Sequence, residues 1–111
     1  MMVIGSSPFG GKTRTAVLLA LRLLNESHPR ELARLLETSL AGVQKALEGL
    51  EVAALVAARS AGRTKLYRIN PRYFAYEDLQ RYLLGLTAPE DELRRRVESL
   101  RRRPRRTGKP Q

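Results

Sequence analysis

The 111-residue sequence contains no cysteine, no tryptophan and a single histidine, His28. Without cysteine there is no disulfide bond, no thiolate metal ligand and no cysteine nucleophile. A lone histidine supplies neither a histidine metal cluster nor, with the carboxylates present, a recognisable triad. We therefore expect no enzyme activity, no bound metal and no cofactor.

Long apolar runs are also scarce. The first twelve residues, MMVIGSSPFGGK, hold too few apolar side chains for a signal peptide, and the leucine-rich run at 16–24 is too short to span a bilayer. We expect a soluble, cytoplasmic protein without a membrane partner. With 42% hydrophobic residues, the chain can build one modest core rather than two.

The positive charge is concentrated at the C-terminal end. Residues 94–111 hold nine of the 21 lysines and arginines and one acid, Glu98, so they carry +8 of the formal net charge of +10. Such a segment strengthens binding to any nucleic acid through counterion release but does not choose a sequence. Because residues 1–93 are nearly neutral, specific binding by them must depend on where their charges lie.

A nucleotide-binding motif is suggested by GSSPFGGKT but fails on spacing. A P-loop needs glycine five residues before its Gly-Lys pair, and that position is Ser6, whereas Gly5 comes one residue too early. No buried strand precedes the segment, and no alternating strands and helices follow. We therefore expect no nucleoside triphosphate hydrolysis.

Residues 13–24, TRTAVLLALRLL, predict a helix that is apolar on more than one face, because eight of the nine residues at 16–24 are apolar. Such a helix needs burial on two sides. We expect a second subunit to cover one of them, which predicts a homodimer; a core helix of a monomer is the alternative.

Two further helices follow in close succession. In residues 27–39, Ser27 is a candidate cap, Pro29 lies near the first turn and leucines recur at helical spacing. Thr38 and Ser39 offer a second cap before an amphipathic helix at 39–51. Two helices joined by about three residues predict a helix-turn-helix.

The apolar period then changes to two, which predicts a β-hairpin at 56–69 with its tip at Ser60 to Gly62. Asn70 and Pro71 end the second strand, and a helix follows at 76–86. Thr87, Pro89 and Glu90 resemble a capping box, which predicts a basic amphipathic helix at 87–103.

The predicted fold class is mainly α with a small β-hairpin wing: a winged helix-turn-helix with a three-helix core and C-terminal helices. We expect residues 1–8 to be a flexible N-terminus, 9–86 to form the domain, 87–103 to form the basic helix and 104–111 to be a disordered basic tail.

The stretch ELARLLETSLAGVQKALEGLEVAALV, followed by a wing and YRINP and preceded by FGGKTR, resembles the winged helix-turn-helix transcriptional regulators of the ArsR and MarR-like type. The resemblance covers about residues 9–86. Its most specific positions are Ala33, Ser39 with Val43, the pair Leu47 and Leu50, and the pair Leu55 and Val56.

The resemblance implies that helix 39–51 enters the major groove of double-stranded DNA, that the wing at 56–69 touches the backbone or minor groove, and that the first and last helices dimerise. We therefore expect a homodimeric, sequence-specific transcriptional regulator. The alternative is a winged-helix protein-interaction module whose arginine-rich tail binds nucleic acid without specificity.

The sequence departs from this family at two points. Ala54 stands where such sequences usually have glycine after the recognition helix, so we expect a slightly different turn, because alanine in a left-handed conformation costs about 1 kcal/mol. The cysteine and histidine clusters of ArsR-type metal sensors are missing, so a metal-sensing role does not transfer.

On helix 39–51, helical spacing turns Gln44 and Lys45 outward together with Ala41, Gly42 and Glu48. Gln44 suits adenine, Lys45 suits guanine or a phosphate, and the small residues permit close approach. Ser39 suits capping and phosphate binding, and the wing offers three cations. The predicted DNA-binding residues are Ser39, Leu40, Ala41, Gly42, Gln44, Lys45, Arg59, Arg63 and Lys65. For each of these residues, the alternative to DNA binding is a surface position that is exposed to solvent and binds nothing.

Overall fold

The computed structural model describes residues 2–5 and 7–102. Within them lie five helices and one antiparallel hairpin, in the order α1 (Lys12–Leu24), α2 (Pro29–Leu36), α3 (Leu40–Val52), β1 (Val56–Ala61), β2 (Thr64–Ile69), α4 (Tyr76–Thr87) and α5 (Asp91–Arg102). The fold is mainly helical with a small hairpin, as predicted, and is compatible with a winged helix. The predicted disordered tail at 104–111 lies outside the described residues.

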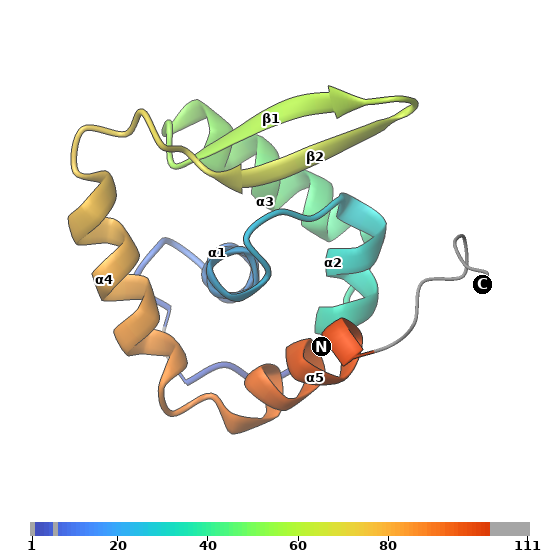
Figure 1. Ribbon diagram of the computed structural model, residues 1–111, viewed down its shortest axis with the longest axis vertical. Coiled ribbons are helices and arrows are strands. Elements are labelled where there is room, and N and C mark those ends of the chain that lie inside the picture. Colours follow the sequence, from blue (N-terminus) through green and yellow to red (C-terminus); the bar gives the residue numbers. More distant parts are fainter. Residues whose placement is uncertain (1, 6, 103–111) are drawn as a thin grey trace.

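Helix α1 occupies the centre of the molecule. Figure 1 shows it end-on, with the other helices and the hairpin arranged around it. Residues 15–21 are all 0% exposed, and α1 contacts α2, α3, α4, α5 and β2 of its own chain. The prediction that a second subunit covers helix 13–24 is therefore wrong, because the short elements that follow wrap both of its apolar sides.

The N-terminal segment is part of the core. Met2 and Ile4 are buried, and the Met2 backbone N–H donates to the Leu36 carbonyl at 2.9 Å. The Gly5 N–H donates to Glu90 Oε2 at 3.0 Å. The prediction of a flexible N-terminus does not fit Met2 and Ile4, whose side chains fill space between elements far apart in the sequence, whereas Val3 is 84% exposed.

The start of α2 is capped by His28 rather than by Ser27. His28 Nδ1 accepts a hydrogen bond from the Glu31 N–H at 3.2 Å, which satisfies a free donor of the first turn. Ser27 instead exchanges two backbone hydrogen bonds with Tyr67 of β2, at 3.0 and 2.7 Å, and its hydroxyl donates to Glu31. The residues before α2 are thus joined to the wing.

The connection between α2 and α3 runs from Glu37 to Ser39. Glu37 adopts the left-handed conformation, with φ 56°, and the Thr38 N–H donates to the Ala33 carbonyl at 3.0 Å, which closes the end of α2. Ser39 Oγ then accepts from the Gly42 N–H at 3.0 Å. The predicted Ser39 cap is confirmed, and so is the short turn between the helices.

After α3 the chain reverses at Ala54, which lies in the left-handed region with φ 65°. Asn70, at the end of β2, donates from Nδ2 to the Ala54 carbonyl and from its backbone N–H to Leu55, both at 3.0 Å. The sequence predicts a slightly different turn here because alanine replaces the usual glycine; Ala54 nevertheless adopts the left-handed conformation, and these bonds hold the chain in it.

The hairpin spans residues 56–69 as predicted, with Val56 paired to Ile69 and Ala61 paired to Thr64. Its tip is Gly62 and Arg63 rather than Ser60 to Gly62. Gly62 has φ 65°, which glycine adopts without a steric penalty and which suits a two-residue hairpin turn. The strand therefore continues through Ser60, which pairs with Lys65.

The predicted capping box before α5 does not form. Thr87 is the last residue of α4, is 1% exposed and donates its hydroxyl to the Leu84 carbonyl at 2.7 Å. Helix α5 begins at Asp91, and its Leu93 and Val97 are 1% and 3% exposed. The predicted basic amphipathic helix at 87–103 corresponds to α5, which begins at Asp91 and contacts α1, α2 and α4.

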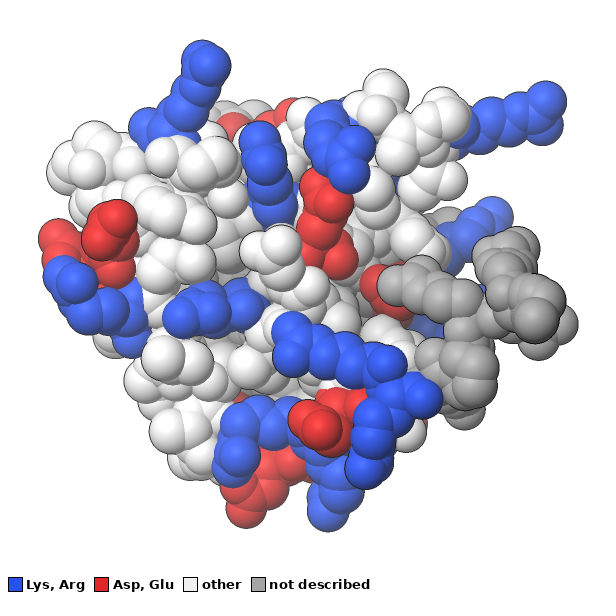
Figure 2. Space-filling model, in the orientation of Figure 1, with Lys and Arg blue, Asp and Glu red and all other residues white. Residues whose placement is uncertain are grey.

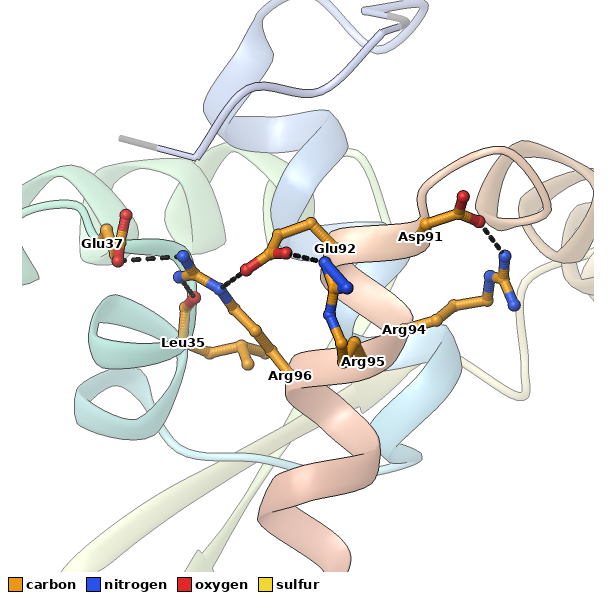
Figure 3. A network of polar contacts seen from close by, with 7 residues as sticks. All are labelled: Leu35, Glu37, Asp91, Glu92, Arg94, Arg95 and Arg96. Carbon is orange, nitrogen blue, oxygen red and sulfur yellow. Dashed lines mark hydrogen bonds and ion pairs between the residues drawn. The ribbon is translucent and has the colours of Figure 1, made fainter.

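A polar network attaches α5 to the end of α2 (Figure 3). Arg96 donates from Nη1 to the Leu35 carbonyl at 3.1 Å and from Nε to Glu92 at 2.8 Å, and its Nη2 lies 3.0 Å from Glu37 Oε2. The hydrogen bond from Arg96 is the largest cause that lowers the pKa of Glu92. The guanidinium thus satisfies a carbonyl that the end of α2 leaves free.

In the described part of the chain, no helix combines the length and the apolar character that crossing a membrane requires.

Candidate nucleic-acid interface

The two faces of α3 divide as the sequence predicts. Val43, Ala46, Leu47 and Leu50 are buried against the core, at no more than 5% exposed, whereas Leu40 is half-buried. The opposite face presents Ala41, Gln44, Lys45 and Glu48 exposed and Gly42 half-buried. Small residues in the first turn with longer polar ones in the next form a surface on which a groove edge can approach the backbone closely.

The charge on α3 changes along its length. Lys45 is its only basic residue, and the exposed acids Glu48 and Glu51 follow, with Val52 90% exposed at the C-terminal end. The helix dipole adds partial positive charge at the Ser39 end and negative charge at the other. The N-terminal half of α3 therefore suits a polyanion, and the C-terminal half repels one.

Two of the three predicted wing cations project into solvent. Arg63 occupies the turn and Lys65 is the second residue of β2, and both are exposed. Lys65 Nζ lies 5.6 Å from the centroid of the Tyr67 ring, which orients the ammonium along the strand. Figure 1 shows the hairpin extending beyond the helical body, so its end can reach a surface beside the one that α3 contacts.

Arg59 differs from the other wing cations. It lies within β1 opposite Leu66, away from the tip, and donates from Nε and Nη2 to both carboxylate oxygens of Glu26, at 2.7 and 2.9 Å. This pairing lowers the pKa of Glu26 and raises that of Arg59. Arg59 as a DNA-binding cation stays a prediction, and its charge is paired with Glu26, a residue distant in sequence.

One cation that the sequence pattern does not single out lies beside α3. Arg14, from the first turn of α1, is exposed and lines the same shallow depression as Lys45, Glu48 and Gly49. Nothing in the local sequence indicates this position, because it depends on how α1 crosses α3.

The rest of the surface has mixed charge. Figure 2 shows basic side chains spread over the visible face, with acidic side chains beside several of them, most clearly over α5. This agrees with the nearly neutral charge of residues 1–93.

A second hollow, a polar cleft of about 230 Å³, lies between α1, α4 and the base of the hairpin. Arg22, Arg68 and the Glu26 to Arg59 pair line it, together with Gln80. We find no nucleophile and base brought together there. Among residues 2–5 and 7–102, no group of three potential metal-ligating side chains occurs.

Comparisons of the chain with models of known protein families, with curated proteins and with solved structures found no match. The functional assignment therefore depends on the geometry of α3 and the wing.

Proposed function

We propose that this protein binds double-stranded DNA sequence-specifically as a transcriptional regulator, with α3 in the major groove and the hairpin against the backbone or minor groove. The observation that carries the proposal is the outward face of α3: Ala41, Gln44 and Lys45 are exposed on the second helix of a helix-turn-helix pair. An α-helix fits the major groove, and these side chains match its donor and acceptor pattern.

Each polar residue has a separate role in this proposal. Gln44 makes paired hydrogen bonds to an adenine edge, and Lys45 donates to guanine or to a phosphate. Ser39 is committed to capping through Gly42, so it contributes by presenting the helix N-terminus. Arg63 and Lys65 bind phosphates, which position the domain without reading bases.

A homodimer remains part of the proposal, but on a different surface. Since residues 15–21 of α1 are buried within the chain, the dimer needs another surface, and α4 offers one in Tyr82 and Leu84, which are 50% and 49% exposed; the Tyr82 ring packs beside Phe9. A two-fold pair joined through α4 would bind two half-sites about one helical turn apart. Light scattering at micromolar concentration tests it: the mass of a dimer, lost in Leu84→Arg, supports it, and a monomeric unaltered chain contradicts it.

The acidic C-terminal half of α3 favours a second candidate function, a protein-interaction module. Glu48 and Glu51 repel phosphates, and Val52 offers an exposed apolar contact at the same end. In that case nucleic acid would be held by the basic C-terminal residues alone.

The deciding experiment is selection from a random duplex library with the full chain at physiological salt, where binding through the tail is weakened. The full chain is needed because Leu93 and Val97 belong to the core. Enrichment of a defined motif supports the regulator. Binding without enrichment, abolished by changing the tail arginines 103, 105 and 106 to glutamine, supports the interaction module.

Substitution on the enriched duplex then tests the mechanism. We expect Gln44→Ala to cost about 1–3 kcal/mol and to relax preference at one base position. Arg63→Ala should weaken binding to all sequences equally. The matched control is Arg95→Ala, which removes one exposed cation on α5 that pairs with Glu92. If all three variants bind alike, the proposed contact surface is wrong.

A further inference from the structure

Arg14 of α1 lies directly across α3 at Gly49. A β-carbon built on Gly49 would lie 2.6 Å from Arg14 Cζ and 3.0 Å from Arg14 Nε, closer than real side chains approach. The guanidinium therefore occupies the space that any other residue at position 49 would fill. Helix propensity does not explain a glycine at position 49, because glycine is unfavourable inside a helix. The absence of a side chain there leaves room for the Arg14 guanidinium.

The position of Arg14 supplies what α3 lacks. Lys45 is the only cation of α3, and Glu48 and Glu51 oppose it. Arg14 is exposed, lines the depression that contains Lys45, and makes no hydrogen bond or ion pair with the described residues. An exposed and unpaired guanidinium keeps all of its hydrogen-bond donors for an external acceptor.

We propose that Arg14 is a phosphate-binding residue of the DNA interface, and that the missing side chain at Gly49 is what seats it beside Lys45. This inference rests on the proposed function. Arg14 contacts the DNA backbone and positions α3 in the groove, whereas Gln44 reads a base. The two cations, Arg14 and Lys45, offset the acidic half of α3.

The test measures affinity by fluorescence anisotropy over a series of KCl concentrations, using the full chain and the duplex enriched by selection. We expect Arg14→Gln to bind about tenfold more weakly and to reduce the slope of log affinity against log salt by about 1, since one phosphate contact is lost. Arg95→Gln, which removes the same charge on α5, should change neither quantity beyond a small general effect.

Gly49 is tested against a matched glycine. Gly85 lies in α4, and an alanine β-carbon at that position would have no atom within 4 Å, so Gly85→Ala improves helix propensity without a clash. We expect Gly49→Ala to weaken DNA binding several-fold and Gly85→Ala, once light scattering shows its mass to be unchanged, to leave DNA binding unchanged. In an Arg14→Gln background, Gly49→Ala should have no further effect, because the residue it displaces is gone.

The outcomes separate the two proposals. If the unaltered chain binds no duplex specifically, the proposed function fails. If the unaltered chain binds but Arg14→Gln keeps its affinity and salt slope, only this inference fails. If Gly49→Ala weakens binding equally with and without Arg14, Gly49 does not act through Arg14 and the inference is overturned. Circular dichroism melts confirm that each variant is folded.

Discussion

Replacing Ala54 with glycine should stabilise this protein. Ala54 has φ 65°, and its side chain is exposed, so the methyl group contributes no burial that glycine would lose. A left-handed conformation costs alanine about 1–2 kcal/mol, while glycine loses about 0.5–1 kcal/mol more conformational entropy on folding. The difference predicts that Ala54→Gly raises the free energy of unfolding by about 0.5–1 kcal/mol and the midpoint of thermal unfolding by about 2–4 °C.

The control is the neighbouring residue. Ala53 is also exposed but has φ −78° and ψ 0°, which alanine adopts without strain. Ala53→Gly should therefore destabilise by about 0.5–1 kcal/mol, the opposite sign. Urea denaturation followed by circular dichroism gives both values. If Ala54→Gly lowers the unfolding free energy, or if both variants shift alike, the strain assigned to this turn is refuted.

Three further predictions concern the core and the wing. Thr15 is 0% exposed and its hydroxyl has no hydrogen-bond partner among the described residues, so Thr15→Val should stabilise by about 1 kcal/mol in urea denaturation and Thr15→Ser should not. Ile4→Ala should cost about 2–4 kcal/mol in the same assay, whereas a flexible N-terminus would give no change. The pKa of Glu26 is lowered by its hydrogen bond to Arg59, so this pair stabilises the fold above the ordinary carboxyl pKa, and that contribution is lost as pH falls through the lowered value. Glu26→Gln should reduce the fall of the unfolding free energy with decreasing pH in the acid range. An unchanged pH dependence would contradict a stabilising role of the Glu26–Arg59 pair.

Local patterns in the sequence were sufficient for the elements themselves. Apolar residues at helical spacing predicted α1 to α4 to within a few residues, and the change to a period of two predicted the hairpin at 56–69. The Ser39 cap and the outward face with Gln44 and Lys45 followed from the same rules, because capping and amphipathicity depend on residues only a turn or two apart.

The local patterns did not predict contacts with partners distant along the chain. The turn at Ala54 depends on Asn70, sixteen residues away. The hydrogen bonds from Asn70 overcome the preference of alanine for a negative φ. Arg59 reads as a free cation until Glu26, 33 residues upstream, is placed beside it.

The sequence by itself determined the helices, the hairpin, the single core and the candidate reading face, since each depends on periodicity along a short segment. Only the tertiary structure decided that residues 15–21 of α1 are covered by their own chain, that Met2 and Ile4 belong to the core and that Arg14 lies beside Gly49. Those features depend on the crossing of elements distant in sequence, and the interactions that fix them leave no periodic trace in the chain.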